Sequence, residues 1–266
     1  MNLSIITINY NDAVGLRKTI ESVVAQTSPD IEYLVIDGGS TDGSVGVIEE
    51  YRDKISFWVS EPDRGIYHAM NKGIARATGN YCQFLNSGDW LVAPDTTQRM
   101  LASLNGSVIA YGNLIKHWPD GRTHRNKAVE ANSLFTYYSG TLNHASAYIR
   151  RDLFAHYGPY DESLKIVADW KFYLLAVGLG GESVQYINVD VVNFDMSGIS
   201  NQQSDLEKTE RRRVLEEALP AKLLADYDRY GTSLRQLRRM EHYPWAQKLV
   251  WLLDRLLFKW EKHRNG

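Results

Sequence analysis

The chain has 266 residues, of which 44% are apolar and 23% charged, and its formal net charge is −2. These values exclude a disordered chain, a collagen and a coiled coil. The single cysteine, Cys82, excludes a disulfide framework and a thiolate metal cluster. The small negative net charge argues against a nucleic-acid partner, although the charged residues are distributed unevenly along the chain. Residues 205–266 hold 14 basic and 10 acidic side chains, whereas the other 204 residues hold 16 and 22.

The first residues, MNLSIITINYND, contain no basic segment, and their apolar run stops at Asn9. A secretory signal is therefore not expected. No stretch approaches the roughly 20 apolar residues that cross a bilayer. Together with the single cysteine, these features predict a cytoplasmic protein.

The first half of the chain alternates strands and helices. Short, largely apolar runs predict strands at 3–8, 31–36, 55–59 and 81–85, and the first of these runs is rich in β-branched residues. Helices are expected between them, after Asn11 or Asp12, near 44–51 and over 65–77. The apolar side of the first helix is expected to carry Val14, Ile20, Val23 and Val24. This alternation predicts an α/β fold with a mostly parallel sheet and helices on both faces.

Polar segments follow these strands at Asn9–Asp12, Asp37–Asp42 and Asn86–Asp89. In parallel sheets, ligands bind at the carboxyl ends of the strands. The first turn has no G-x-G-x-x-G motif, and the chain has no P-loop. Carboxylates can hold a diphosphate through a divalent cation, and Asp or Asn can read a base or ribose directly. The residues therefore favour metal-assisted binding of a nucleoside diphosphate.

The second half is less regular. The turn at Pro119–Gly121 predicts a hairpin of 107–118 and 122–127. Further elements are expected in chain order: a strand at 145–150, a helical turn at 151–157, a helix at 169–177, a strand at 184–194 and a Gly/Ser loop at 195–201. From about residue 204 the pattern is helical, with breaks near Gly231 and Pro244. These patterns predict a main domain over 1–203 and a helical C-terminal region over 204–266.

Four segments in order resemble family 2 glycosyltransferases of the GT-A fold, the inverting nucleotide-sugar enzymes of bacterial surface-polysaccharide assembly. They are SIITINYND with the helix after it, YLVIDGGSTDGS, EPDRGIYHAMNKGIARATGNYCQFLNSGD, and HASAYIRRDLF followed by GPYDESLKIVADWKFYLL. Together they cover roughly residues 3–200. The resemblance implies a metal-dependent transferase that moves a sugar from a nucleoside-diphosphate sugar to a hydroxyl of a glycan or lipid-linked glycan precursor. The donor expected from the resemblance is a UDP-sugar.

The resemblance also implies donor-binding roles in the first half. Thr7 and Asn9 match the point where the first strand meets the nucleotide. Asp37 matches the aspartate that binds the uracil or ribose, and Asp42 the second carboxylate of that loop. Their alternative roles are a strand-end turn for Asp37 and an Asx turn or helix cap for Asp42. Asn71 and Lys72 match a helix position near the diphosphate, although Lys72 could equally be a solvated lysine. His68 stands where this subgroup would be expected to have an aspartate.

Asp89 matches the last carboxylate of the family's Asp-x-Asp element and would bind Mg²⁺ or Mn²⁺ between the donor phosphates. The element reads Asn86-Ser87-Gly88-Asp89 here, so it has lost one carboxylate. Asn86 could accept from a ribose hydroxyl or only shape the turn. Asp169 matches the catalytic base, and its alternative is a helix N-cap. His144 matches a histidine near the diphosphate or acceptor, or serves the fold.

The segment 245–262, WAQKLVWLLDRLLFKWEK, predicts an amphipathic helix. Its apolar stripe is Trp245, Leu249, Leu252, Leu253, Leu256 and Trp260, and its cationic residues lie mostly off that stripe. Such a helix suits peripheral contact with the inner face of the cell membrane, where lipid-linked acceptors lie. It could instead pack on its own domain or on another subunit of a homo-oligomer. Two further alternatives remain for the whole chain: a non-catalytic module that binds carbohydrate or a partner, and a transferase with a non-glycan acceptor.

Overall fold

The computed structural model describes residues 2–128, 133–197, 204–240 and 243–264, with side chains as far as Glu261. The chain forms two compact units, Met1–Glu217 and Ala218–Gly266. The predicted division after residue 203 stays a prediction. The helix that follows that point belongs by its contacts to the first unit.

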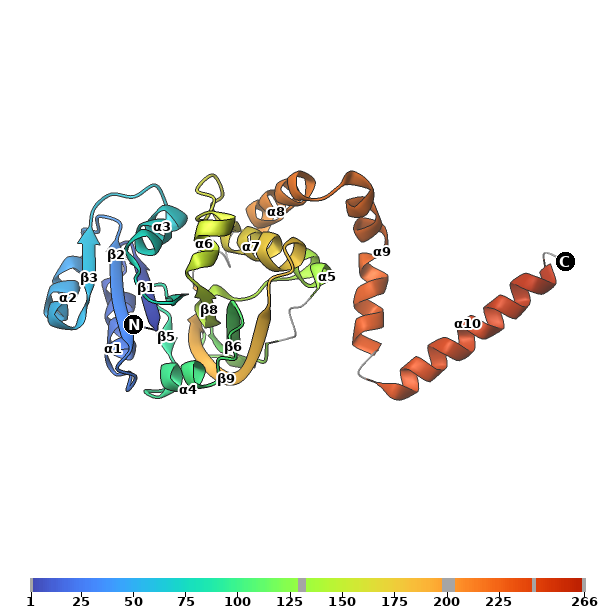
Figure 1. Cartoon of the computed structure of the whole chain (residues 1–266), viewed down its shortest axis with the longest axis horizontal. Coiled ribbons are helices and arrows are strands. Elements are labelled where there is room, and N and C mark those ends of the chain that lie inside the picture. The colour runs from blue at the N-terminus through green and yellow to red at the C-terminus, as the bar shows by residue number, and fades with distance from the viewer. Residues whose placement is uncertain (1, 129–132, 198–203, 241–242, 265–266) are drawn as a thin grey trace. The chain divides into compact units, whose positions relative to one another are not determined.

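A mixed sheet forms the centre of the first unit. Its strands are β1 (Leu3–Asn9), β2 (Ile31–Asp37), β3 (Phe57–Ser60), β4 (Tyr81–Phe84), β5 (Trp90–Leu91), β6 (Ile109–His117), β7 (Thr123–Asn126), β8 (Ala147–Arg150) and β9 (Val184–Asp195). They are ordered β3-β2-β1-β4-β8-β6-β9-β5, and β7 pairs with β6. From β3 to β4 the strands are parallel, whereas β8 is antiparallel to both of its neighbours. In Figure 1, β1, β2 and β3 lie side by side.

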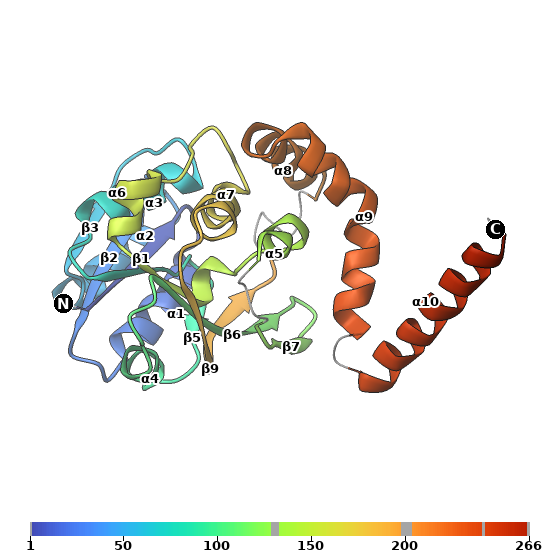
Figure 2. The same ribbon diagram turned by 45° about the vertical axis from the view of Figure 1, so that its right-hand side comes forward.

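Helices cover both faces of the parallel part. The helices of the first unit are α1 (Ala13–Val24), α2 (Ser44–Glu50), α3 (Ile66–Arg76), α4 (Thr96–Ala102), α5 (Leu134–Ser139), α6 (Asp152–Tyr157), α7 (Ala168–Tyr173) and α8 (Ser204–Ala218). The buried side of α1 packs with Leu3 and Ile5 of β1. On the opposite face, Gly73 of α3 lies so close to Ile6 that a Cβ there would collide with it. Figure 2 shows α4 and α7 beside the second half of the sheet.

The strand and helix pattern of the first half is confirmed, with one misplaced side chain. Val14 is 84% exposed, and α1 instead buries Leu16, Thr19, Ile20 and Val23. Asp12 caps this helix, because its Oδ1 accepts from the Gly15 backbone N at 2.9 Å. The hairpin of β6 and β7 is also confirmed. The helix predicted over 169–177 ends as an α-helix at Tyr173 and continues as a π-helix over Leu174–Leu179.

The second unit holds α9 (Ala221–Met240) and α10 (Pro244–Arg264). The break predicted near Gly231 is wrong, because α9 runs through that glycine, whose cost within a helix is only about 1 kcal/mol. The break comes earlier, before α9 at Pro220, while the break at Pro244 is confirmed. Among the described residues, no helix is both long and apolar enough to span a bilayer. Residues 198–201 of the predicted Gly/Ser loop lie outside the described residues.

Candidate active site

The turns after β1 and β2 are bound to each other. Asn11 has a left-handed backbone, with φ of 53°, a region that asparagine tolerates. Its backbone N donates to Ser40 Oγ at 2.8 Å, and its Oδ1 accepts from the Thr41 backbone N at 2.9 Å. The Asp42 carboxylate accepts from the backbone N of Ala13 at 2.8 Å and from Ser44 Oγ at 2.6 Å. Asp42 therefore joins the starts of α1 and α2.

Asp37 is buried at the end of β2 with both carboxylate oxygens occupied. Asn9 Nδ2 donates to it at 2.7 Å, Ser40 Oγ at 2.5 Å and Ser60 Oγ at 2.6 Å. The backbone N atoms of Gly39 and Ser40 add contacts of 3.2 and 2.9 Å. Burial by itself raises the pKa of Asp37, but these hydrogen bonds outweigh it and lower the pKa. The carboxylate is therefore ionised and holds the turn together.

Asn9 and Thr7 are also engaged within the protein. Asn9 Oδ1 accepts from Ser87 Oγ at 2.8 Å, so this side chain links the turns after β1, β2 and β4. Thr7 is fully buried, and its Oγ1 accepts from the Tyr33 hydroxyl at 3.1 Å. The structure thus places Thr7 in the core, whereas Asn9 reaches the cavity described next.

A cavity of about 1080 Å³ opens at the carboxyl ends of β1 and β4 and is lined by the first unit. Half of the predicted site residues line it: Asn9, Asn86, Asp89, His144 and Asp169. The other half lie outside its lining: Thr7, Asp37, Asp42, Asn71 and Lys72. Gly38 and Gly39 do line it, so the turn that Asp37 organises presents backbone to the cavity.

Asp169 lies in the first turn of α7 and is held by two side chains from distant parts of the chain. His144 Nδ1 is 3.1 Å from its Oδ2, and the Tyr67 hydroxyl is 3.0 Å from its Oδ1. The N-cap of α7 is Val167, so Asp169 is not the capping residue. Burial raises the pKa of Asp169, but the hydrogen bond and charge of His144 and the Tyr67 hydrogen bond lower it overall.

His144 connects Asp169 to the turn after β4. It begins a short 3₁₀ turn, His144–Ser146, which Asn143 caps by accepting from the Ala145 backbone N at 3.0 Å. Its Nε2 is 3.3 Å from Asn86 Nδ2; if that amide donates, Nδ1 carries the proton that points to Asp169. Burial lowers the pKa of His144, and the hydrogen bond and charge of Asp169 raise it above its usual value. The pair therefore has an ionised carboxylate that accepts the Nδ1 proton of the imidazole.

Asn86 leaves one polar atom available. Its Oδ1 is buried and has no hydrogen-bond partner within the described ranges, although the side chain lines the cavity. Orphaned buried acceptors are uncommon and call for an explanation. A hydroxyl of a bound ligand would satisfy this one.

Asp89 is 4% exposed, and its Oδ1 accepts from the Asp195 backbone N at 2.9 Å. Burial raises the pKa of Asp89 to about 7, and the charge of Asp195 adds to this effect. A cation would relieve both effects. The part of the chain that the structure describes holds no group of three His, Cys, Asp or Glu side chains placed around one ion. Asp89 and Asp195 therefore fit a divalent cation only together with ligand phosphate oxygens.

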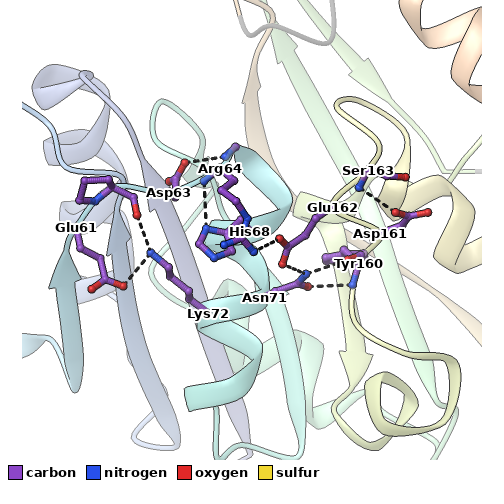
Figure 3. A network of polar contacts seen from close by, with 12 residues as sticks. Glu61, Asp63, Arg64, His68, Asn71, Lys72, Tyr160, Asp161, Glu162 and Ser163 are labelled. Atoms are coloured by element: carbon purple, nitrogen blue, oxygen red, sulfur yellow. Dashed lines mark hydrogen bonds and ion pairs between the residues drawn. The ribbon is translucent and has the colours of Figure 1, made fainter.

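Asn71 and Lys72 take part in a polar network that crosses α3 (Figure 3). Asn71 Nδ2 donates to the Tyr160 carbonyl at 2.9 Å, and Lys72 Nζ lies 2.9 Å from a Glu61 carboxylate oxygen. His68 Nδ1 accepts from the Arg64 backbone N at 3.1 Å, and the Arg64 guanidinium pairs with Glu162 at 2.6 Å. This network fastens the 61–65 loop and the 160–163 turn to α3, and both segments lead into the cavity wall.

Tyr67, Asp195 and Arg211 are among the cavity residues that the sequence did not single out. Tyr67 lies in the first turn of α3, Asp195 is the last residue of β9, and Arg211 belongs to α8. Arg211 pairs with Glu207 at 3.0 Å, and its guanidinium lies 4.7 Å from the centre of the Trp170 ring. For Asp195, its position at the end of a predicted strand was an available signal. For the other two, no local pattern marks a site.

Comparisons with known proteins identify the family. Residues 4–158 match the sequence model described as Glycosyl transferase family 2. An uncharacterized glycosyltransferase of Mycobacterium tuberculosis is 35% identical over 207 residues, which cover 75% of this chain and 77% of that protein. A PGL/p-HBAD biosynthesis glycosyltransferase of Mycobacterium bovis is 29% identical over 215 residues, which cover 78% of this chain and 82% of that protein.

Two solved structures share the fold. S. aureus TarS in complex with UDP-GlcNAc gives a TM-score of 0.59 at 19% identity, over 73% of this chain and 58% of the TarS chain. A mannosyltransferase from Pyrobaculum calidifontis, solved with GDP-Man and Mn²⁺, gives 0.55 at 16% identity, over 70% of this chain and 55% of the other. The predicted GT-A fold with a helical C-terminal region is confirmed.

Proposed function

Because the chain belongs to glycosyltransferase family 2, we propose that it is an inverting enzyme that uses a nucleoside-diphosphate sugar as donor. The proposed donor is a UDP-sugar. The acceptor is a hydroxyl of a glycan or lipid-linked glycan precursor of the cell surface. The TarS complex with UDP-GlcNAc supports the donor class, and the relative named for PGL/p-HBAD biosynthesis supports a cell-surface product. The observation that carries the proposal is the Asp169 carboxylate in the cavity wall, held by His144 and Tyr67.

In the proposed reaction, Asp169 is the general base. It takes the proton of the acceptor hydroxyl while that oxygen forms a bond to the anomeric carbon. The bond from this carbon to the diphosphate breaks, and its electron pair leaves with the nucleoside diphosphate. A single displacement of this kind inverts the anomeric centre, and a positioned base contributes roughly 10²–10⁴ in rate. Asn86 Oδ1 is placed to accept from a sugar or ribose hydroxyl.

We further propose that Asp89, with Asp195, holds Mg²⁺ or Mn²⁺ together with the donor phosphates. When bound, the ion neutralises charge on the departing nucleoside diphosphate. Asp89→Ala should then abolish the Mn²⁺-dependent part of UDP binding in calorimetric titration. Unchanged UDP affinity in that variant would show that any ion is held elsewhere.

Hydrolysis of the donor tests the activity. Wild-type protein is screened against a library of nucleotide sugars, and UDP, GDP, TDP and CMP are compared for thermal stabilisation with and without Mn²⁺. Turnover of a UDP-sugar supports the proposal. A non-catalytic module would show no turnover and no metal-dependent stabilisation, while donor turnover without transfer to any glycan would favour a non-glycan acceptor.

The exposed apolar surface of α10 supports peripheral contact with the inner, cytoplasmic face of the membrane. The stripe residues from Trp245 to Trp260 are between 48% and 68% exposed. Trp251 and Phe258 are also exposed off the stripe, and the Arg255 guanidinium lies 4.7 Å from the centre of the Trp251 ring. The segment 218–266 holds ten Lys and Arg against five Asp and Glu, a net charge that suits anionic lipid.

Liposome partition tests this contact. Full-length Leu252→Glu/Leu256→Glu should bind anionic vesicles less than wild type, with donor hydrolysis unchanged, and deletion of 241–266 should do the same. Asp254→Asn, which lies off the stripe, is the control and should not weaken binding. Equal partition of wild type and variants would refute the membrane role. If wild type forms a concentration-dependent dimer and the double variant is a monomer, the stripe is instead an interface with a second copy of the chain.

A further inference from the structure

The Tyr67 hydroxyl lies between the Asp169 carboxylate and a backbone carbonyl. Its oxygen is 3.0 Å from Asp169 Oδ1 and 2.5 Å from the Ile166 carbonyl oxygen. The ring is 5% exposed and packs against Tyr160, with ring centroids 5.6 Å apart. Tyr67 comes from α3, 102 residues before Asp169 in the chain.

A tyrosine hydroxyl has one proton, so it can donate to only one of these two acceptors at a time. Burial and the charge of Asp169 raise the pKa of Tyr67 far above its usual value, so the hydroxyl keeps its proton. The contact with the Ile166 carbonyl is the shorter one, but a hydrogen bond to an ionised carboxylate is the stronger kind, so both acceptors compete for this proton while Asp169 is ionised. Once the carboxyl is protonated, the Ile166 carbonyl remains available to the same proton.

We propose that Tyr67 is a positioning residue for the base: it orients the Asp169 carboxylate, holds it ionised before proton transfer, and turns its proton to Ile166 afterwards. This inference rests on the proposed role of Asp169. With His144 on Oδ2 and Tyr67 on Oδ1, each carboxylate oxygen has a side-chain donor. Rotation of the carboxylate would break both hydrogen bonds.

The second acceptor is itself fixed by α8. The Glu210 carboxylate is buried and accepts from the backbone N of Lys165 at 2.7 Å and of Ile166 at 3.0 Å. These hydrogen bonds fix the backbone segment that carries the Ile166 carbonyl. The Tyr67 hydroxyl therefore has two acceptors in defined places, one that titrates and one that does not.

Other titratable groups also face Asp169, and the test must separate them from Tyr67. They are His144 of the 3₁₀ turn, Tyr160 of the 160–163 turn, Tyr173 of α7 and Arg211 of α8. Tyr160 supplies a matched control. Its hydroxyl is buried in the same aromatic cluster but has no hydrogen-bond partner among the described residues.

The experiment compares the pH dependence of transfer in wild type, Tyr67→Phe and Tyr160→Phe, with melting temperatures measured for all three. Loss of the Tyr67 hydrogen bond disfavours the carboxylate and raises the pKa of Asp169. The acidic limb of kcat/KM for the acceptor should therefore move to higher pH, by roughly one pH unit. The limb should stay in place in Tyr160→Phe. Donor KM should change little in either variant.

A second substitution reverses the sign. Fluorotyrosine at position 67 keeps the ring and makes the hydroxyl a stronger donor, so the limb should move to lower pH. This also covers the case in which Tyr67→Phe does not fold. An unmoved limb in both Tyr67 variants, or equal movement in Tyr160→Phe, would overturn the role of Tyr67. Absence of sugar transfer in wild type, or full transfer in Asp169→Asn, would instead overturn the proposed function.

Discussion

Two carboxylates of the first unit, the fully buried Asp37 and the partly buried Asp169, are held in contrasting ways. Both have a lowered pKa because hydrogen bonds outweigh burial. The donors to Asp37 come from its own turn and from the adjoining ends of β1 and β3, at Asn9 and Ser60. The side-chain donors to Asp169 come from α3 and from the 3₁₀ turn at His144.

The second difference is access. Asp169 lines the cavity, whereas Asp37 does not and is fully buried. A carboxylate whose oxygens are filled by its own turn stabilises that turn and shapes the backbone around it. A carboxylate that is held by one side-chain donor per oxygen and still reaches a cavity can exchange a proton with a ligand. The hydrogen-bond partners of a carboxylate and its access to the cavity thus separate the two roles.

The largest expected effect is at Asp169. Asp169→Asn keeps the shape and an oxygen for Tyr67 but cannot take a proton, so sugar transfer should fall by roughly 10²–10⁴. Nucleotide affinity and melting temperature should stay close to wild type. Transfer assays measure the loss of activity, and calorimetric titration with UDP measures the nucleotide affinity. Normal turnover in Asp169→Asn would move the base to another carboxylate and remove the contrast with Asp37.

The reverse pattern is expected at Asp37. In Asp37→Asn one oxygen becomes an NH₂ group that faces donors such as Ser40 and Ser60, so hydrogen bonds are lost. The free energy of unfolding should fall by about 1–3 kcal/mol, measured by chemical denaturation. Transfer should fall only as far as the turn at Gly38 and Gly39 is disturbed. The exposed Asp53→Asn is the control, and a destabilisation as large there would mean that the Asp37 network contributes little.

The effect of Asp37 on stability should also depend on pH. Its folded pKa is lowered, so its contribution is fully present above the unfolded pKa of about 3.9. It is lost as the pH falls through the folded pKa. The difference in unfolding free energy between wild type and Asp37→Asn should therefore shrink on going from pH 5 toward pH 3. A difference that stays constant over this window would mean that Asp37 does not titrate there.

The sequence predicted the parallel half of the fold well, because each strand there is a short, largely apolar run that a polar loop follows. Through the family resemblance it led to Asp169, the proposed base, and to four other residues that line the cavity. It could not predict the contact of Tyr67 with Asp169, because this contact depends on how α3 and α7 lie relative to each other in the folded chain. Gly231 misled for a different reason: a lone glycine is a weak helix breaker, and the prolines decided the boundaries.

The smallest expected effect is at Lys72, where the resemblance and the geometry lead to different outcomes. The structure has Lys72 Nζ 2.9 Å from a Glu61 carboxylate oxygen and 3.3 Å from the Pro62 carbonyl, outside the cavity lining. If this arrangement persists with donor bound, Lys72→Met should change UDP affinity by less than about twofold, since exposed pairs contribute little. A lysine that contacts the diphosphate would instead weaken binding roughly tenfold or more when removed. Calorimetric titration separates the two, with Lys72→Arg as the control that keeps the charge. Tenfold weaker binding in the Met variant alone would place Lys72 among the donor-binding residues and require the 61–65 loop to rearrange when the donor binds.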